Sequence, residues 1–167
     1  TNQRLFVADM YNHRVLVFDL SSGISNGMDA AYVLGQADFE SNAAATTQSG
    51  LNYPNGLAYD SSTQRLFVAD TYNNRVLIFD LSSGITNGME AADLLGQLDD
   101  DWNPVYTKNG VNNSPNRLGF SHPRDNVIDP ANHRLFVADT YNNRVLVFNL
   151  DADNNLQDRI ADYVLGQ

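Results

Sequence analysis

Three closely similar segments follow one another along the chain. The hexapeptide Arg-Leu-Phe-Val-Ala-Asp occurs at residues 4–9, 65–70 and 134–139, at spacings of 61 and 69 residues. Residues 4–36 and 65–97 are identical at 26 of 33 positions. Repetition at this level predicts one supersecondary unit used three times, because a unit of this size must stack on its neighbours to bury its apolar residues.

Each unit has the pattern of four short strands separated by turns. Runs rich in β-branched and aromatic residues predict the strands of the second unit at residues 57–59, 65–69, 75–79 and 92–95. Residues 60–64 and 71–74 have the composition of tight turns, and no stretch shows helical periodicity. Apolar residues point to both faces in Leu66–Val68, so this strand must be covered on both sides.

Sheets of four antiparallel strands with two apolar faces can bury both by packing around an axis. We therefore predict an all-β chain, a β-propeller of four-stranded antiparallel blades with about three blades present and the ring incomplete. Residues 1–36 are a blade lacking its inner strand, residues 37–97 a full blade, and residues 98–167 a full blade with a longer inter-blade loop. Two blade faces would stay open, so we favour a fragment of a longer protein, with association of copies as the alternative.

The motif Val-Ala-Asp-x-Tyr-Asn-Asn-Arg-Val-Leu-x-Phe, at residues 68–79 of the second unit, resembles the core of the NHL repeat. The Leu-Gly-Gln-x-Asp-Phe element at Leu34–Phe39 further resembles long-blade NHL proteins of bacteria, many of which are predicted to be exported or surface-attached. The chain departs from the family pattern at one position of each unit. It has Tyr11, Tyr72 and Tyr141 where the family usually has Gly. The resemblance implies a propeller that serves as an interaction or structural module.

The charge balance restricts the class of partner. The chain has 20 Asp and Glu against 10 Lys and Arg, a formal net charge of −10. Some NHL propellers bind RNA through a basic face, but this chain lacks the surplus of cations that phosphates require, so we expect no nucleic acid. We also expect no membrane insertion, because no apolar run approaches the ~20 residues of a span. Acidity, abundant Asn and the absence of Cys fit an extracellular or cell-surface protein of a bacterium or archaeon.

An acid and a base recur five residues apart in every unit. The pairs are Asp9 with Arg14, Asp70 with Arg75, and Asp139 with Arg144. Identical chemistry in each repeat indicates a structural role, because a catalytic centre breaks the symmetry of its scaffold. We expect the Asp to accept hydrogen bonds from hairpin N–H groups while the Arg pairs with it.

Binding is expected at one face of the propeller. The connections between blades, residues 37–50 and 98–119, differ in length and share a face with the hairpins that carry Tyr11, Tyr72 and Tyr141. Variable loops on a rigid scaffold usually carry binding. Trp102, Tyr106 and Asp100 make the second connection a candidate contact surface for a protein, peptide or glycan. Packing of Trp102 on its own blade is an equally good explanation.

The alternative function is a metal-dependent lyase or hydrolase with its site at the central channel. NHL-like amidating lyases hold zinc through His residues there, and His122 is the candidate in this chain, although its repeat equivalent is Tyr53. Catalytic zinc needs about three protein ligands. Asp151 and Asp153 superficially resemble a calcium loop, with Leu156 where Gly is required. We therefore expect no enzyme activity, no cofactor and no metal, with His122, Asp151 and Asp153 as weak metal candidates.

Overall fold

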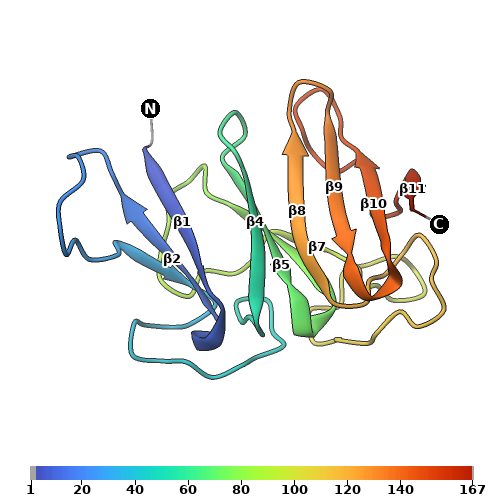
Figure 1. The fold of residues 1–167 in the computed structure, drawn as a ribbon, viewed down its shortest axis with the longest axis horizontal. Coiled ribbons are helices and arrows are strands. Elements are labelled where there is room, and N and C mark those ends of the chain that lie inside the picture. The colour runs from blue at the N-terminus through green and yellow to red at the C-terminus, as the bar shows by residue number, and fades with distance from the viewer. Residues whose placement is uncertain (1–2, 167) are drawn as a thin grey trace.

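Residues 3–166 are described by the computed structural model, and they form three antiparallel sheets that stand side by side (Figure 1). The first sheet contains β1 (Arg4–Asp9), β2 (Arg14–Asp19) and β3 (Tyr32–Leu34). The second contains β4 (Pro54–Asp60), β5 (Arg65–Asp70), β6 (Arg75–Asp80) and β7 (Asp93–Leu95). The third contains β8 (Pro123–Asp129), β9 (Arg134–Asp139), β10 (Arg144–Asn149) and β11 (Tyr163–Leu165). Gln167, the last residue of the predicted third blade, lies outside the described residues, as do residues 1 and 2.

The all-β propeller architecture is confirmed, because strand order follows chain order in every sheet and each strand pairs antiparallel with the next. The first strand of the middle sheet is longer than predicted. It begins at Pro54 rather than Leu57, and its register with β5 shifts between these two residues. Among residues 3–166, no helix has the length and apolar character needed to cross a membrane.

The turns between the second and third strands of a blade are tighter than ordinary loops. Each is a single 3₁₀ turn, at Met10–Asn12 (η1), Thr71–Asn73 (η2) and Thr140–Asn142 (η3). A left-handed residue with φ of 51–52° follows each turn, and these residues are His13, Asn74 and Asn143. Asn tolerates this conformation better than most residues, which explains the Asn-Asn pair in two of the three motifs.

The apolar core lies between the sheets, and alternate side chains of β5 enter its two halves. Leu66 and Val68 join a buried cluster with the first sheet, whereas Phe67 joins a second cluster with the third. Leu135 and Val137 of β9 belong to that second cluster, in which they are fully buried. The middle strand is therefore covered on both sides, as its sequence requires.

The outer sheets each keep an apolar face open. Leu5 and Val7 of β1 are 48% and 37% exposed, although their repeat equivalents Leu66 and Val68 are fully buried. On the third sheet an open hollow of about 300 Å³ is lined by Arg134, Phe136, Val147, Tyr163 and Leu165. Both surfaces are equivalent to faces that are covered in the middle blade.

Candidate functional site

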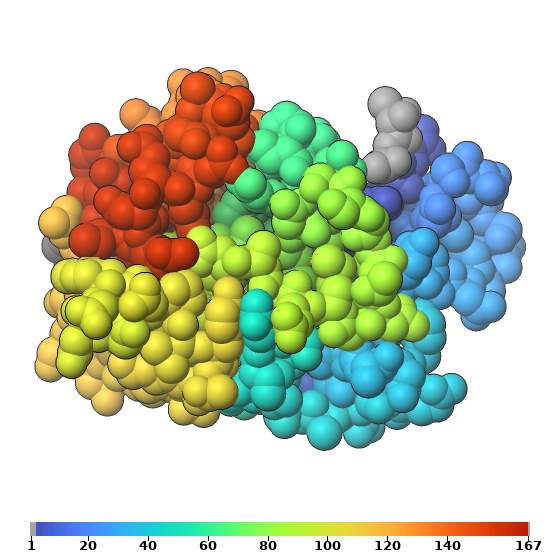
Figure 2. Space-filling view, turned by 180° about the vertical axis from the view of Figure 1, so that it is seen from behind, coloured from blue at the N-terminus to red at the C-terminus, as the bar shows by residue number. Residues whose placement is uncertain are grey.

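The connections between blades lie at the same edge of the sheets as the 3₁₀ turns (Figures 1 and 2). Asn73 Nδ2 donates to Ala45 O at 2.9 Å, and Asn74 Nδ2 donates to Asn109 O at 3.0 Å, so the hairpin at residues 71–74 contacts both connections. From behind, the connections occupy the lower edge in cyan and yellow (Figure 2). We call this edge the hairpin face, defined by residues 10–13, 37–50, 71–74, 98–119 and 140–143.

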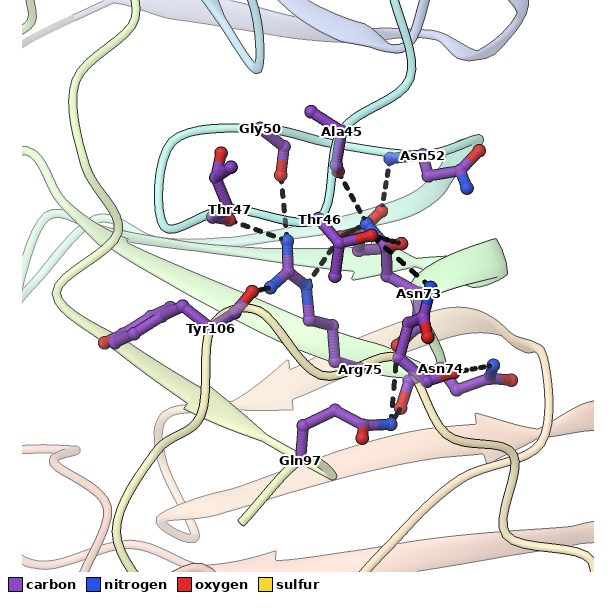
Figure 3. A network of polar contacts seen from close by, with 12 residues as sticks. Ala45, Thr46, Thr47, Gly50, Asn52, Asn73, Asn74, Arg75, Gln97 and Tyr106 are labelled. Atoms are coloured by element: carbon purple, nitrogen blue, oxygen red, sulfur yellow. Dashed lines mark hydrogen bonds and ion pairs between the residues drawn. The ribbon is translucent and has the colours of Figure 1, made fainter. Parts of the chain in front are cut away.

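Arg75 is the centre of the polar network below this face (Figure 3). Its Nε donates to Asp70 Oδ2 at 2.7 Å, and both side chains are fully buried. Its Nη2 donates to the carbonyls of Thr47 and Gly50, each at 2.9 Å, and its Nη1 to that of Tyr106 at 2.6 Å. One guanidinium therefore joins the two connections to the middle blade.

The hydrogen bonds that Asp70 accepts differ from those predicted. Asp70 accepts the backbone N–H of Asn52 at 2.6 Å and the side-chain amide of Asn73 at 2.8 Å. Its side chain does not cap the 3₁₀ turn, so the expected bonds to hairpin N–H groups are replaced by one to Asn52, two residues before the inner strand. Burial raises the pKa of Asp70 above its usual value, and the charge of Arg75 opposes that rise.

Each blade forms its own Asp–Arg pair, and the three pairs differ in how deeply they are buried. The side chains of Asp139 and Arg144 are 0% and 4% exposed, whereas those of Asp9 and Arg14 are 24% and 17% exposed. Each pair has the same Nε to Oδ2 distance of 2.7 Å. This repetition favours a structural role for the pairs.

The three hairpin tyrosines belong to a continuous row of rings that crosses all three blades. Ring centroids are 5.1 Å apart for Tyr11 and Tyr53, and 4.5 Å apart for Tyr53 and Tyr72. The row continues from Tyr72 to His122 at 5.7 Å and from His122 to Tyr141 at 4.2 Å. We call these five residues the aromatic row. Tyr11, Tyr72 and Tyr141 are 77%, 46% and 57% exposed.

The two linking rings are held by the preceding blade. The backbone N–H of Tyr53 donates to His13 Nδ1 at 3.0 Å, and that of His122 donates to Asn74 Oδ1 at 2.8 Å. Tyr53 and His122 have φ of 61° and 52°, a conformation that costs a side-chain-bearing residue about 1–3 kcal/mol. Tyr53 and His122 were predicted to lie at the channel, and the row that they complete was not predicted, although both residues precede the proline that begins an inner strand.

The aromatic row carries little charge of its own. A hydrogen bond with Tyr11, burial and the neighbouring phenols raise the pKa of Tyr53 to about 12. Burial, reinforced by Arg124, lowers the pKa of His122, so its imidazole is neutral at pH 7. The guanidinium of Arg124 lies 5.7 Å from the Tyr141 centroid and provides a positive charge at one end of the row.

The residues predicted on the long connection do not form one cluster. Trp102 and Asp100 line a cavity of about 420 Å³ within residues 96–119, together with Asp99 and Lys108. Trp102 is 48% exposed. Tyr106 does not line that cavity but packs against the core cluster shared by the first two blades. The structure therefore brings Trp102 and Asp100 together and separates Tyr106 from them.

The three metal candidates lie in two separate parts of the structure. His122 belongs to the aromatic row. Asp151 accepts the backbone N–H groups of Asp153 and Asn155, at 2.9 and 2.8 Å, in a turn beside the link from Asn154 to Asp60. Within residues 3–166, no three His, Cys, Asp or Glu side chains gather in a way that could hold a metal ion.

Known proteins match the chain at the level of the repeat. Residues 51–79 match the NHL repeat family. "NHL repeat-containing protein 2" of Gallus gallus is 32% identical over 85 residues, which are 48% of this chain and 11% of that protein. The Homo sapiens protein of the same name is 31% identical over 80 residues, 47% of this chain and 10% of its own length. The match thus spans about a tenth of these curated relatives.

A solved structure supports the fold independently. A candidate 6-phosphogluconolactonase from Bacteroides uniformis superimposes with a TM-score of 0.57 at 14% sequence identity. The match covers 99% of this chain and 40% of that chain. At this identity the likeness concerns the fold alone.

Proposed function

The chain carries an NHL repeat in a propeller-type array, and we propose that it is a non-enzymatic interaction scaffold that binds its partner through the hairpin face. The observation that supports this most strongly is the aromatic row. Tyr11, Tyr72 and Tyr141 are exposed at equivalent positions, and each contacts a ring of its own or the next blade. Rigidly held, exposed aromatic residues are enriched at the energetic centres of binding surfaces.

The polar groups that recur in each blade also favour a scaffold. Asp70 and Arg75 use their hydrogen-bonding groups to hold the fold, and the equivalent pairs do the same. The acidic charge of −10 favours a protein, peptide or glycan partner over a nucleic acid. We propose an extracellular or cell-surface location, supported by the acidity and the absence of Cys.

Variants on opposite ends of the blades test the proposed face. We expect ligands found on peptide and glycan arrays to lose binding to a variant with Tyr11→Ser, Tyr72→Ser and Tyr141→Ser. A matched control, Ile24→Ser, alters an 81% exposed residue in the loop between β2 and β3 and should bind like the wild type. Equal loss of binding in both variants, or retention in both, would contradict the hairpin face. Stoichiometric zinc lost in His122→Ala would favour the lyase or hydrolase instead.

We also propose that further blades of this type cover the two open faces, from sequence beyond this segment or from another copy. The burial of Leu66 and Val68, equivalent to the exposed Leu5 and Val7, supports this. The purified chain should therefore associate in sedimentation velocity, because each open face is shaped for a blade. Leu5→Lys with Val7→Lys should reduce association, whereas Ile24→Lys should not. A monodisperse particle of 18.5 kDa at high concentration would refute the proposal.

A further inference from the structure

We propose that the aromatic row is a docking track for a proline-rich segment of a partner polypeptide in the polyproline II conformation. This inference rests on the proposed function and names the class of partner. The row is suited to such a segment in the closeness of its tyrosines, in its stacked aromatic rings and in its rigidity.

The three exposed tyrosines follow one another closely along the row. Tyr11 and Tyr72 are linked by ring contacts of 5.1 and 4.5 Å through Tyr53. Tyr72 and Tyr141 are linked by contacts of 5.7 and 4.2 Å through His122. Successive tyrosines are therefore at most about 10 Å apart, and one polyproline II turn of three residues rises about 9 Å. Successive tyrosines therefore lie within about one turn of an extended proline segment.

Four rings of the row are stacked in two pairs. Tyr53 and Tyr72 are stacked with an interplanar angle of 11°, and His122 and Tyr141 with an angle of 24°. Stacking covers part of one broad face of each of these rings. Proline rings pack against aromatic side chains, and the solvated carbonyls of polyproline II can accept hydrogen bonds from tyrosine hydroxyls.

The row is organised before any ligand binds. The backbone bonds from Tyr53 to His13 and from His122 to Asn74 fix the two linking rings. Polyproline II is likewise ordered in the free ligand, so association costs little conformational entropy on either side.

Fluorescence anisotropy with a fluorescein-labelled peptide of ten prolines tests the inference. We expect the wild-type chain to bind this peptide and to bind a Gly-Ser peptide of equal length at least about tenfold more weakly. Tyr72→Ser, in the middle of the row, should weaken binding about tenfold. Tyr72→Phe keeps the ring and removes the hydroxyl, so comparing the two variants separates the contribution of the hydroxyl to binding from that of the ring. Ile24→Ser should leave binding unchanged. Tyr141→Ser provides a second row variant, with folding checked by thermal unfolding.

The outcomes distinguish this inference from the proposal on which it rests. Absence of decaproline binding, equal binding of the Gly-Ser peptide, or unchanged binding by both row variants would overturn the proline segment. Binding of cellohexaose that is lost in Tyr72→Ser would overturn it as well, while supporting the hairpin face. Array ligands that bind the triple tyrosine variant as well as they bind the wild type would contradict binding through the hairpin face.

Discussion

Replacing Asp70 by Asn is expected to lower the free energy of unfolding by about 3–5 kcal/mol, because it leaves a buried guanidinium without its counter-charge. Asp70 and Arg75 are both fully buried, and the carboxylate also accepts the N–H of Asn52 and the amide of Asn73. The side-chain amide introduced by Asp70→Asn would present an NH₂ group to donors that require an acceptor. Equilibrium unfolding in urea, followed by fluorescence, measures the loss.

The same substitution at Asp9 is the matched control. Asp9 pairs with Arg14 at the same 2.7 Å distance, but their side chains are 24% and 17% exposed. Water can solvate the charge that Asp9→Asn leaves behind, so we expect a loss of only about 1 kcal/mol. Equal losses for the two variants would show that burial of the pair does not control its contribution.

Replacing Gly96 by Ala is expected to destabilise the fold by about 2–5 kcal/mol, through backbone strain and overpacking together. Gly96 has a φ of +100°, in the region that residues with a side chain rarely adopt. An added Cβ would lie 2.4 Å from Cδ2 of Phe120 and 3.0 Å from the carbonyl oxygen of Asn74. Phe120 is fully buried, and in a close-packed core its ring can move only by displacing its neighbours. Urea unfolding again measures the effect.

Gly84 provides the control that separates backbone strain from overpacking. It has a φ of +110° but no atom lies within 4 Å of an added Cβ. Gly84→Ala should therefore report backbone strain alone and cost about 1 kcal/mol. A Gly96→Ala variant no less stable than Gly84→Ala would mean that the contact with Phe120 is not tight.

The repeated sequence was sufficient to predict the sheets because the apolar pattern and the turn residues of each unit indicate where its strands lie. Apolar residues on both faces of Leu66–Val68 required neighbours on both sides, and the clusters around β5 supply them. The Asn-Asn dipeptide at residues 73–74 predicted a turn, and Asn74 adopts the left-handed conformation that ends it. Local pattern and burial agree in these segments, so sequence alone was informative.

The candidate site could be predicted only in part because it depends on contacts between blades. The sequence singled out Tyr11, Tyr72 and Tyr141 by their recurrence, but the rings that join them come from Tyr53 and His122. These two have different side chains and a backbone conformation that only the neighbouring blade can impose. The Asp70 bond to Asn52 was missed because it joins two residues of the middle blade that lie 18 positions apart in the sequence.

Hydrogen–deuterium exchange of the chain, free and bound to a partner selected on the arrays, tests the central claim most directly. The account predicts that binding protects the backbone amides of residues 10–13, 71–74 and 140–143, where the three exposed tyrosines lie. Turns at the opposite end, such as residues 60–64 and 129–133, should exchange at unchanged rates. Protection confined to those opposite turns, with none at the three hairpins, would contradict binding through the hairpin face.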